Sequence, residues 1–104
     1  MFLVVFRNRK RADFDQEAYG ADAEAMQRLA REQRGFVSFK SYTADDGEVI
    51  ALSEWEDEEA ARAWGRVAEH RVVQQHGRSA YYEEYTLFAC DDPRIHRFTR
   101  KDPA

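Results

Sequence analysis

The stretch FVSFKSYTADDGEVIALSEW, residues 36–55, decides the fold of this 104-residue chain. Two runs rich in apolar, aromatic and β-branched residues, 36–43 and 49–55, flank the turn Asp45-Asp46-Gly47. Such runs are typical of strands, and the glycine is free to adopt the positive φ that a tight hairpin needs. The stretch therefore predicts an antiparallel β-hairpin, around which the other elements are arranged.

A helix is predicted on each side of this hairpin. Before it, residues 19–33 carry inward-facing side chains at spacings of three and four, with Asp13 or Asp15 as the N-cap. Gly35 follows at the place where such helices commonly end. After the hairpin, Asp57 is expected to cap the second helix. The inner face of this second helix is expected to carry Ala60, Ala63, Trp64 and Val67.

The outermost elements are two further strands, expected at Phe2–Phe6 and Tyr81–Cys90. The order is then β-α-β-β-α-β. Two right-handed crossovers in that order produce an α+β, ferredoxin-like domain, with a four-stranded antiparallel sheet and both helices on one face. We expect residues 1–92 to form this single domain and residues 93–104 to form a polar C-terminal tail.

The predicted strands are apolar on both faces, although two helices can cover only one. On the last strand, simple alternation places Tyr81, Tyr85 and Leu87 on one face and Tyr82, Phe88 and Cys90 on the other. The uncovered face would be an apolar patch too large for a stable monomer. We therefore expect a homodimer in which two sheets pack face to face, forming a dimeric α/β barrel.

Composition limits the partners and the compartment. The chain has 16 Lys and Arg against 20 Asp and Glu, a net charge of −4, which argues against a nucleic-acid binder. We expect the basic residues Arg7, Arg9, Lys10 and Arg11 to be solvated rather than to bind nucleic acid. No apolar run approaches the ~20 residues that cross a bilayer, so no membrane association is expected. The single Cys90 fits a reducing environment, and we expect a cytoplasmic protein.

Polar and aromatic residues gather in one later segment, WGRVAEHRVVQQHGRSAYYEEY, residues 64–85. Buried polar groups need partners, so this segment indicates either a dense structural corner or the wall of a small-molecule pocket. His70 could simply cap the second helix, and Gln74 could be solvated. The tyrosines could serve only to pack the sheet.

This segment resembles the antibiotic biosynthesis monooxygenase superfamily of small dimeric α+β barrel proteins. Many members carry the form W-x-x-H-x-E-H-x-x-A-Q-x-x-G-R-x-x-W-Y-x-x-Y. The matching positions here are Trp64, Glu69-His70, Gln74, Gly77-Arg78, Tyr82 and Tyr85. The chain departs from the form at Val67, Val73 and Tyr81, where His, Ala and Trp are frequent. The resemblance extends over about residues 1–92 and implies the fold expected above.

The resemblance also implies a chemistry, because members of one branch oxidise polycyclic phenols with molecular oxygen and neither metal nor flavin. Such a reaction needs a dry pocket, a proton acceptor and donors aimed at the developing oxyanion. We expect His70 to be the catalytic base, since the pKa of histidine lies near neutral pH. The substrate pocket would be formed by Asn8, Trp55, Trp64, Gln74 and Tyr82. No metal ligand or cofactor is expected.

Two alternatives stay open. The haem-degrading branch of the superfamily uses an Asn on the first strand, a Trp on the second helix and a His ten residues after that Trp. Asn8 and Trp64 stand at comparable places, but the position of the iron-ligating His is Gln74 here, with His70 and His76 displaced along the chain. The other alternative is a structural or small-ligand-binding dimer without turnover.

Overall fold

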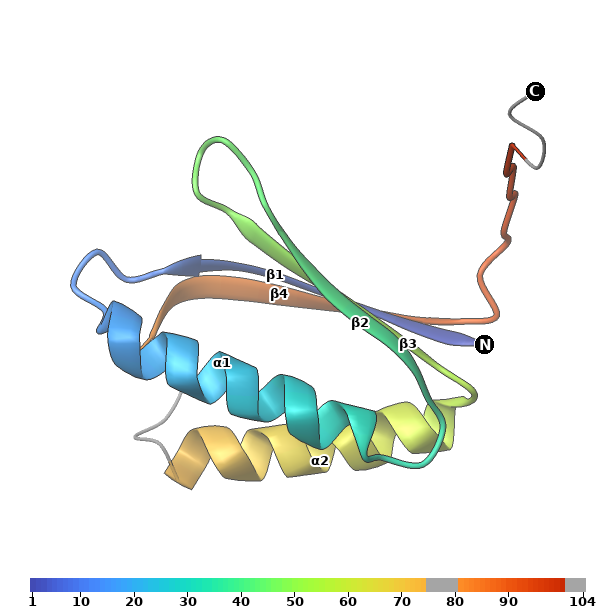
Figure 1. Ribbon diagram of the computed structural model, residues 1–104, viewed down its shortest axis with the longest axis horizontal. Coiled ribbons are helices and arrows are strands. Elements are labelled where there is room, and N and C mark those ends of the chain that lie inside the picture. The colour runs from blue at the N-terminus through green and yellow to red at the C-terminus, as the bar shows by residue number, and fades with distance from the viewer. Residues whose placement is uncertain (75–80, 101–104) are drawn as a thin grey trace.

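The predicted element order is present in the computed structural model, which describes residues 1–74 and 81–100, and the side chains of all these residues except 69–74. The elements are β1 (Phe2–Lys10), α1 (Gln16–Arg31), β2 (Phe36–Thr43), β3 (Val49–Trp55), α2 (Glu58–Gln74) and β4 (Tyr82–Asp91). Both helices lie beneath the same face of the sheet (Figure 1). The α+β, ferredoxin-like arrangement expected from the sequence is therefore confirmed.

The sheet is antiparallel, with the strand order β2-β3-β1-β4. The face toward the helices, here called the helix face, receives alternate β1 side chains from Phe2 to Lys10. The residues between them, such as Val5 and Arg7, lie on the other face, here called the open face. Strand β1 is paired with β4 along its whole length and with β3 from Phe2 to Asn8. It therefore runs through the middle of the molecule and positions groups at both ends.

Local chemistry fixes the ends of the elements as the sequence predicts. The Asp15 carboxylate accepts a hydrogen bond from the Ala18 backbone N–H at 3.0 Å, so Asp15 rather than Asp13 caps α1. The Asp57 carboxylate caps α2 in the same way, through the Ala60 backbone N–H at 2.7 Å. In the hairpin turn, Gly47 has a φ of +90°.

Two strand predictions need correction. Strand β1 continues to Lys10 rather than ending at Phe6, so Asn8 lies inside the strand. In the β1–β4 pairing, the register shifts between Arg9 and Lys10, and simple alternation along β4 fails there. As a result, Tyr82 shares the helix face with Tyr85.

The hydrophobic core lies between the helix face and the two helices, toward the start of β1. Trp55 is completely buried, with its indole stacked on that of Trp64 at a centroid distance of 6.0 Å. The Trp55 indole N–H donates to the Ser53 hydroxyl at 3.0 Å, which satisfies its polar group. The buried apolar residues of this core are Phe2, Ala30, Trp55, Ala60, Ala61 and Trp64.

We expect Gly35→Ala to lower the free energy of unfolding by about 2–4 kcal/mol, combining left-handed backbone strain with overpacking. Gly35 has a φ of +78°, and an added Cβ would lie 2.6 Å from the Ala60 Cβ. Gly47→Ala is the matched control, because Gly47 also has a positive φ but nothing within 4 Å of the added Cβ. Urea unfolding of both variants measures the difference. Equal losses would contradict a close contact between Gly35 and α2.

Beyond β4 the chain leaves the body of the molecule (Figure 1). Residues 93–100 form neither helix nor strand, and the Phe98 side chain is 77% exposed. Within residues 1–74 and 81–100, neither helix has an apolar segment long enough to cross a bilayer.

Candidate functional site

A partly buried polar cluster lies at the end of the sheet opposite the tryptophans. It consists of Asn8 and Lys10 on β1, Tyr19 on α1 and Tyr82 on β4, and is called the Asn8 cluster below. Asn8 is only 2% exposed, and its side-chain carbonyl accepts a hydrogen bond from the Lys10 ammonium. The Lys10 Nζ lies 4.5 Å from the centroid of the Tyr19 ring and 5.4 Å from that of Tyr82. Three separate elements therefore converge on one ammonium group.

Local backbone geometry explains why these side chains meet. Asn8 and Lys10 are two residues apart on a strand, so both point to the helix face. The register shift after Arg9 then places Tyr82 opposite Lys10. The Phe6 ring packs against the cluster, with its centroid 5.5 Å from that of Tyr82 and 5.3 Å from that of Tyr85.

Burial controls the protonation of the cluster. It raises the pKa of both Tyr19 and Tyr82. Both hydroxyls are therefore protonated at neutral pH. Burial lowers the pKa of Lys10, while the adjacent tyrosine rings and the Asn8 carbonyl favour its charged form.

A second polar contact joins the neighbouring Tyr81 to α1. The Tyr81 hydroxyl donates to the Asp22 carboxylate at 2.6 Å, and this hydrogen bond is the main cause that raises the pKa of Tyr81 to about 12. The Tyr81 ring also packs edge-on against that of Tyr19, at a centroid distance of 5.3 Å. Tyr81 thus links the start of β4 to α1 and packs beside the Asn8 cluster through its contact with Tyr19.

We expect the protein to lose stability between pH 10 and about 12, the ordinary and the folded-state pKa of Tyr81. Below pH 10 this tyrosine is protonated in both states, and its contribution to stability is complete. Within the window unfolding releases a proton, so the free energy of unfolding falls as the pH rises.

Tyr81→Phe should make this alkaline loss shallower, although Tyr19 and Tyr82 still contribute to it. Urea unfolding midpoints from neutral pH to about pH 11 measure the slope. Tyr42→Phe, at an exposed tyrosine on β2, is the control. An unchanged slope in Tyr81→Phe would contradict the role given to the hydrogen bond with Asp22.

The side chains of the Asn8 cluster offer more hydrogen-bond donors than acceptors. In the described part of the chain, the Asn8 amide NH₂ group donates to no acceptor, although the residue is buried. Buried polar groups without partners are rare in proteins, and each one calls for an explanation such as a bound water, an ion or a catalytic role. The amide, the ammonium and the tyrosine hydroxyls together present several donors and no carboxylate. Such a set is suited to binding an oxygen that carries negative charge.

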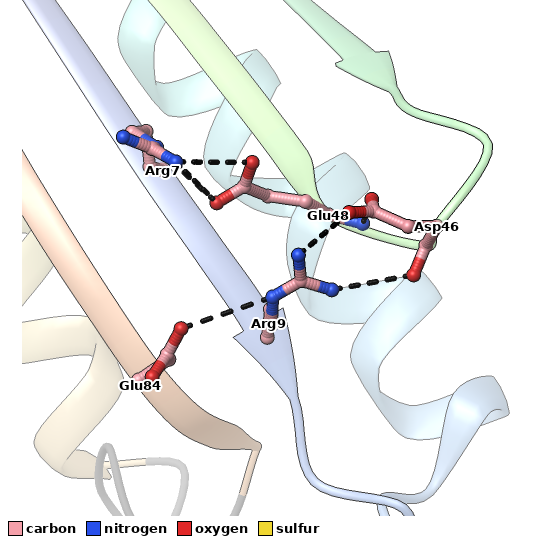
Figure 2. A network of polar contacts seen from close by, with 5 residues as sticks. All are labelled: Arg7, Arg9, Asp46, Glu48 and Glu84. Carbon is pink, nitrogen blue, oxygen red and sulfur yellow. Dashed lines mark hydrogen bonds and ion pairs between the residues drawn. The ribbon is translucent and has the colours of Figure 1, made fainter.

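The open face above this end carries a different kind of polar network (Figure 2). Arg7 pairs with Glu48 at 3.0 Å, and Arg9 pairs with Asp46 at 2.8 Å and approaches Glu84 at 3.8 Å. A hollow of about 140 Å³ lies beside it, lined by Arg7, Asn8, Glu48, Glu84, Tyr85 and Thr86. This hollow is smaller than the several hundred Å³ of typical ligand pockets. The network therefore neutralises the two arginines, and the hollow lined by these described residues is not by itself a pocket for a multi-ring molecule.

The structure brings together only some of the residues predicted to form the pocket. Asn8 and Tyr82 meet in the Asn8 cluster. Trp55 and Trp64 stack at the other end of β1, since Trp55 is paired with Phe2, six residues before Asn8, or about 20 Å along a strand. The side chains of His70 and Gln74 lie outside the described residues, and their expected roles stay predictions. So does His76.

Sequence reasoning missed Lys10 and Tyr19 as members of the site. In the sequence, Lys10 stands among arginines that are expected to be solvated, although its two-residue spacing from Asn8 indicates that both side chains share a face. Tyr19 was placed on the inner stripe of its helix, but nothing in the sequence linked it to the far strand. Among the described residues, no three His, Cys, Asp or Glu side chains gather as a metal site would require.

The fold and this site define a class of protein: a ferredoxin-like α+β domain with a buried, donor-rich cluster between sheet and helices. Residues 1–76 match the family model described as antibiotic biosynthesis monooxygenase. The chain belongs to this family.

Individual proteins are similar to this chain in sequence or in fold. The uncharacterized protein YqjZ of Bacillus subtilis is 34% identical over 86 residues, which cover 83% of this chain and 74% of YqjZ. The structure of Rv0793 from Mycobacterium tuberculosis superposes with a TM-score of 0.69 at 17% identity, covering 97% of this chain and 98% of the other. SnoaB, a cofactor-independent oxygenase from Streptomyces nogalater, gives a TM-score of 0.65 at 16% identity and 97% coverage of both chains. At these identities the two structures establish the fold alone.

Proposed function

We propose that this protein is a cofactor-independent oxygenase that oxidises a small aromatic, polyketide-like molecule with molecular oxygen. The observation that carries the proposal is the buried Asn8 amide, whose two donors have no acceptor among the described residues. Family membership and the fold shared with SnoaB support the same reaction class. The reaction needs donors where an oxyanion develops, and the Asn8 cluster supplies them.

The proposed chemistry divides between two groups of residues. Asn8 and Tyr82 would donate hydrogen bonds to the substrate oxygen, while His70 would accept the proton that the substrate loses. For an anthrone, the ring methylene carbon becomes a carbonyl, one oxygen atom of O₂ enters the product and the other leaves as water. The substrate itself supplies the electrons, so its deprotonated form is the species that reacts with oxygen.

The test is oxygen consumption with 1,8-dihydroxyanthrone in the presence of EDTA, together with the absorbance of the anthraquinone product. We expect one O₂ consumed per quinone formed, at a rate above the spontaneous reaction. His70→Ala should lower the rate by about 10²–10⁴-fold, the usual contribution of a general base. A rate equal to that of buffer would reject the proposed function. An unchanged rate in the variant would reject His70 as the base.

We also propose that two copies pair through the open face, which no helix covers (Figure 1). Phe88 on β4 and Tyr42 on β2 are each 49% exposed, so large aromatic rings lie uncovered on both edge strands of this face. The arginines at one end are already paired with acidic residues, so a second copy would not meet a field of like charge.

Phe88→Asp is expected to weaken this association by about 100-fold, because the carboxylate would lose its hydration between the sheets. Light scattering at micromolar concentration measures the change. Leu87→Asp is the matched control, since Leu87 is similarly exposed but pairs with Phe6 on the helix face. A monomeric wild-type protein would contradict the dimer.

Haem binding is a second proposal, favoured by the position of Asn8 inside β1, as in the haem-degrading branch. The described residues fit it less well, because the Trp64 indole is already stacked on Trp55 in the core. His96, the one histidine whose side chain is described, lies exposed on the tail. Adding haem and recording the Soret band tests this proposal. A ligand-binding dimer without turnover would instead bind an aromatic molecule and consume no oxygen.

A further inference from the structure

Lys10 differs from the arginines that flank it. Arg7 and Arg9 each form ion pairs on the open face (Figure 2). Lys10 points to the helix face, where it forms no ion pair with any described residue. The charge of a half-buried ammonium is costly to desolvate without an anion nearby. Its contacts are one amide carbonyl and two aromatic rings, which satisfy it only in part.

The neighbours of Lys10 orient the ammonium without neutralising it. The Asn8 carbonyl occupies one of its three donors, and the faces of Tyr19 and Tyr82 stabilise its charge. The Asp22 carboxylate on α1 is already engaged, because it accepts the hydrogen bond of the Tyr81 hydroxyl. The Lys10 ammonium therefore keeps its positive charge and further N–H donors beside the Asn8 NH₂ group, which has no acceptor among the described residues.

We propose that Lys10 binds an anionic oxygen of the ligand, so that the site selects phenols or enols in their ionised form. This inference rests on the proposed function, because the molecule whose ionised form Lys10 would bind is the substrate of the proposed oxygenase. Lys10 and Asn8 would hold the same oxygen from two sides, the ammonium by charge and the amide by a directed hydrogen bond. Burial lowers the pKa of Lys10, and a bound anion would raise it again.

The test uses 1,8-dihydroxyanthraquinone, which resembles the product, cannot be oxidised further in the same way, and changes colour when a phenol ionises. Spectral titration of the dye with and without protein gives the apparent pKa of the bound phenol. The 1,8-dimethoxy derivative cannot ionise and reports shape alone. Lys10→Met removes the charge, and Lys10→Arg restores a charge at the same place. Lys40→Met is the matched control, because Lys40 also lies over a tyrosine ring, Tyr42, but on an exposed part of β2.

We expect wild type and Lys40→Met to lower the pKa of the bound dye. Lys10→Met should abolish this shift and weaken binding of the phenolate about tenfold, the size of one charged hydrogen bond. Lys10→Arg should restore part of the shift, and the dimethoxy derivative should bind all four proteins alike.

The inference would be overturned if the dye bound to Lys10→Met had the same pKa as the dye bound to wild type, with the variant shown to be folded by circular dichroism. A wild-type protein that binds neither dye would also overturn it. A Lys10-dependent shift without oxygen consumption would support the inference and reject the oxygenase. Oxygen consumption without a Lys10-dependent shift of the dye pKa would support the oxygenase and overturn the inference about Lys10.

Discussion

Asn8→Ala is expected to lower kcat/KM for 1,8-dihydroxyanthrone by about 100-fold, the usual cost of losing one oxyanion donor. The wild-type amide is buried and keeps its donors free, so it can meet a developing charge without rearranging. Most of the loss should fall on kcat, because the interaction strengthens as negative charge grows on the substrate oxygen.

Asn8→Asp separates the loss of the donors from the loss of packing. The carboxylate has nearly the same shape and can still accept from Lys10, but it offers no N–H donor. We expect it to be at least as inactive as Asn8→Ala. If Asn8→Asp turned over the anthrone at the wild-type rate, the amide could not be the group that stabilises the oxyanion.

Trp55→Ala is expected to destabilise the fold by about 3–5 kcal/mol, the range for truncating a large core side chain. Trp55 contacts Phe36 edge-on at 5.7 Å and stacks on Trp64, so its removal would open a cavity under β2, β3 and α2. Domains of this size are stable by about 5–15 kcal/mol, so the variant would be close to unfolding at room temperature.

Urea unfolding with a fitted m-value measures this loss. Trp55→Phe is the control, because it keeps an aromatic ring in place while removing the N–H that donates to Ser53. It should lose clearly less stability than Trp55→Ala. A loss below about 1 kcal/mol for Trp55→Ala would show that Trp55 is not central to the core.

The fold was predictable because each element carries its own local signal. Asp15, Asp57 and Gly47 act at the positions where their chemistry is most useful, two helix N-termini and one hairpin turn. These interactions depend on a few adjacent residues and can be read from a single sequence. The apolar strands between them then leave few possible arrangements.

The candidate site was less predictable because it depends on a break in regular alternation. The structure places both Asn8 and Tyr82 beside Lys10, yet the register shift after Arg9 that brings Lys10 opposite Tyr82 leaves no clear mark in the sequence. Trp55 and Trp64 were placed in the same pocket because aromatic residues suit both cores and ligand sites. Only the pairing of Trp55 with Phe2 shows that these rings lie at the other end of β1.

Strand β1 carries the core residue Phe2 at its start and the proposed ligand-binding residues Asn8 and Lys10 at its end, with about 20 Å of paired backbone between Phe2 and Asn8. Changes at sites this far apart, with no shared partners, usually have additive energies. The region around Asn8 and Lys10 can therefore accumulate substitutions while Phe2 and Trp55 keep the domain folded. Such a division would allow one small scaffold to diverge toward new ligands in single steps, each tolerated by an unaltered core.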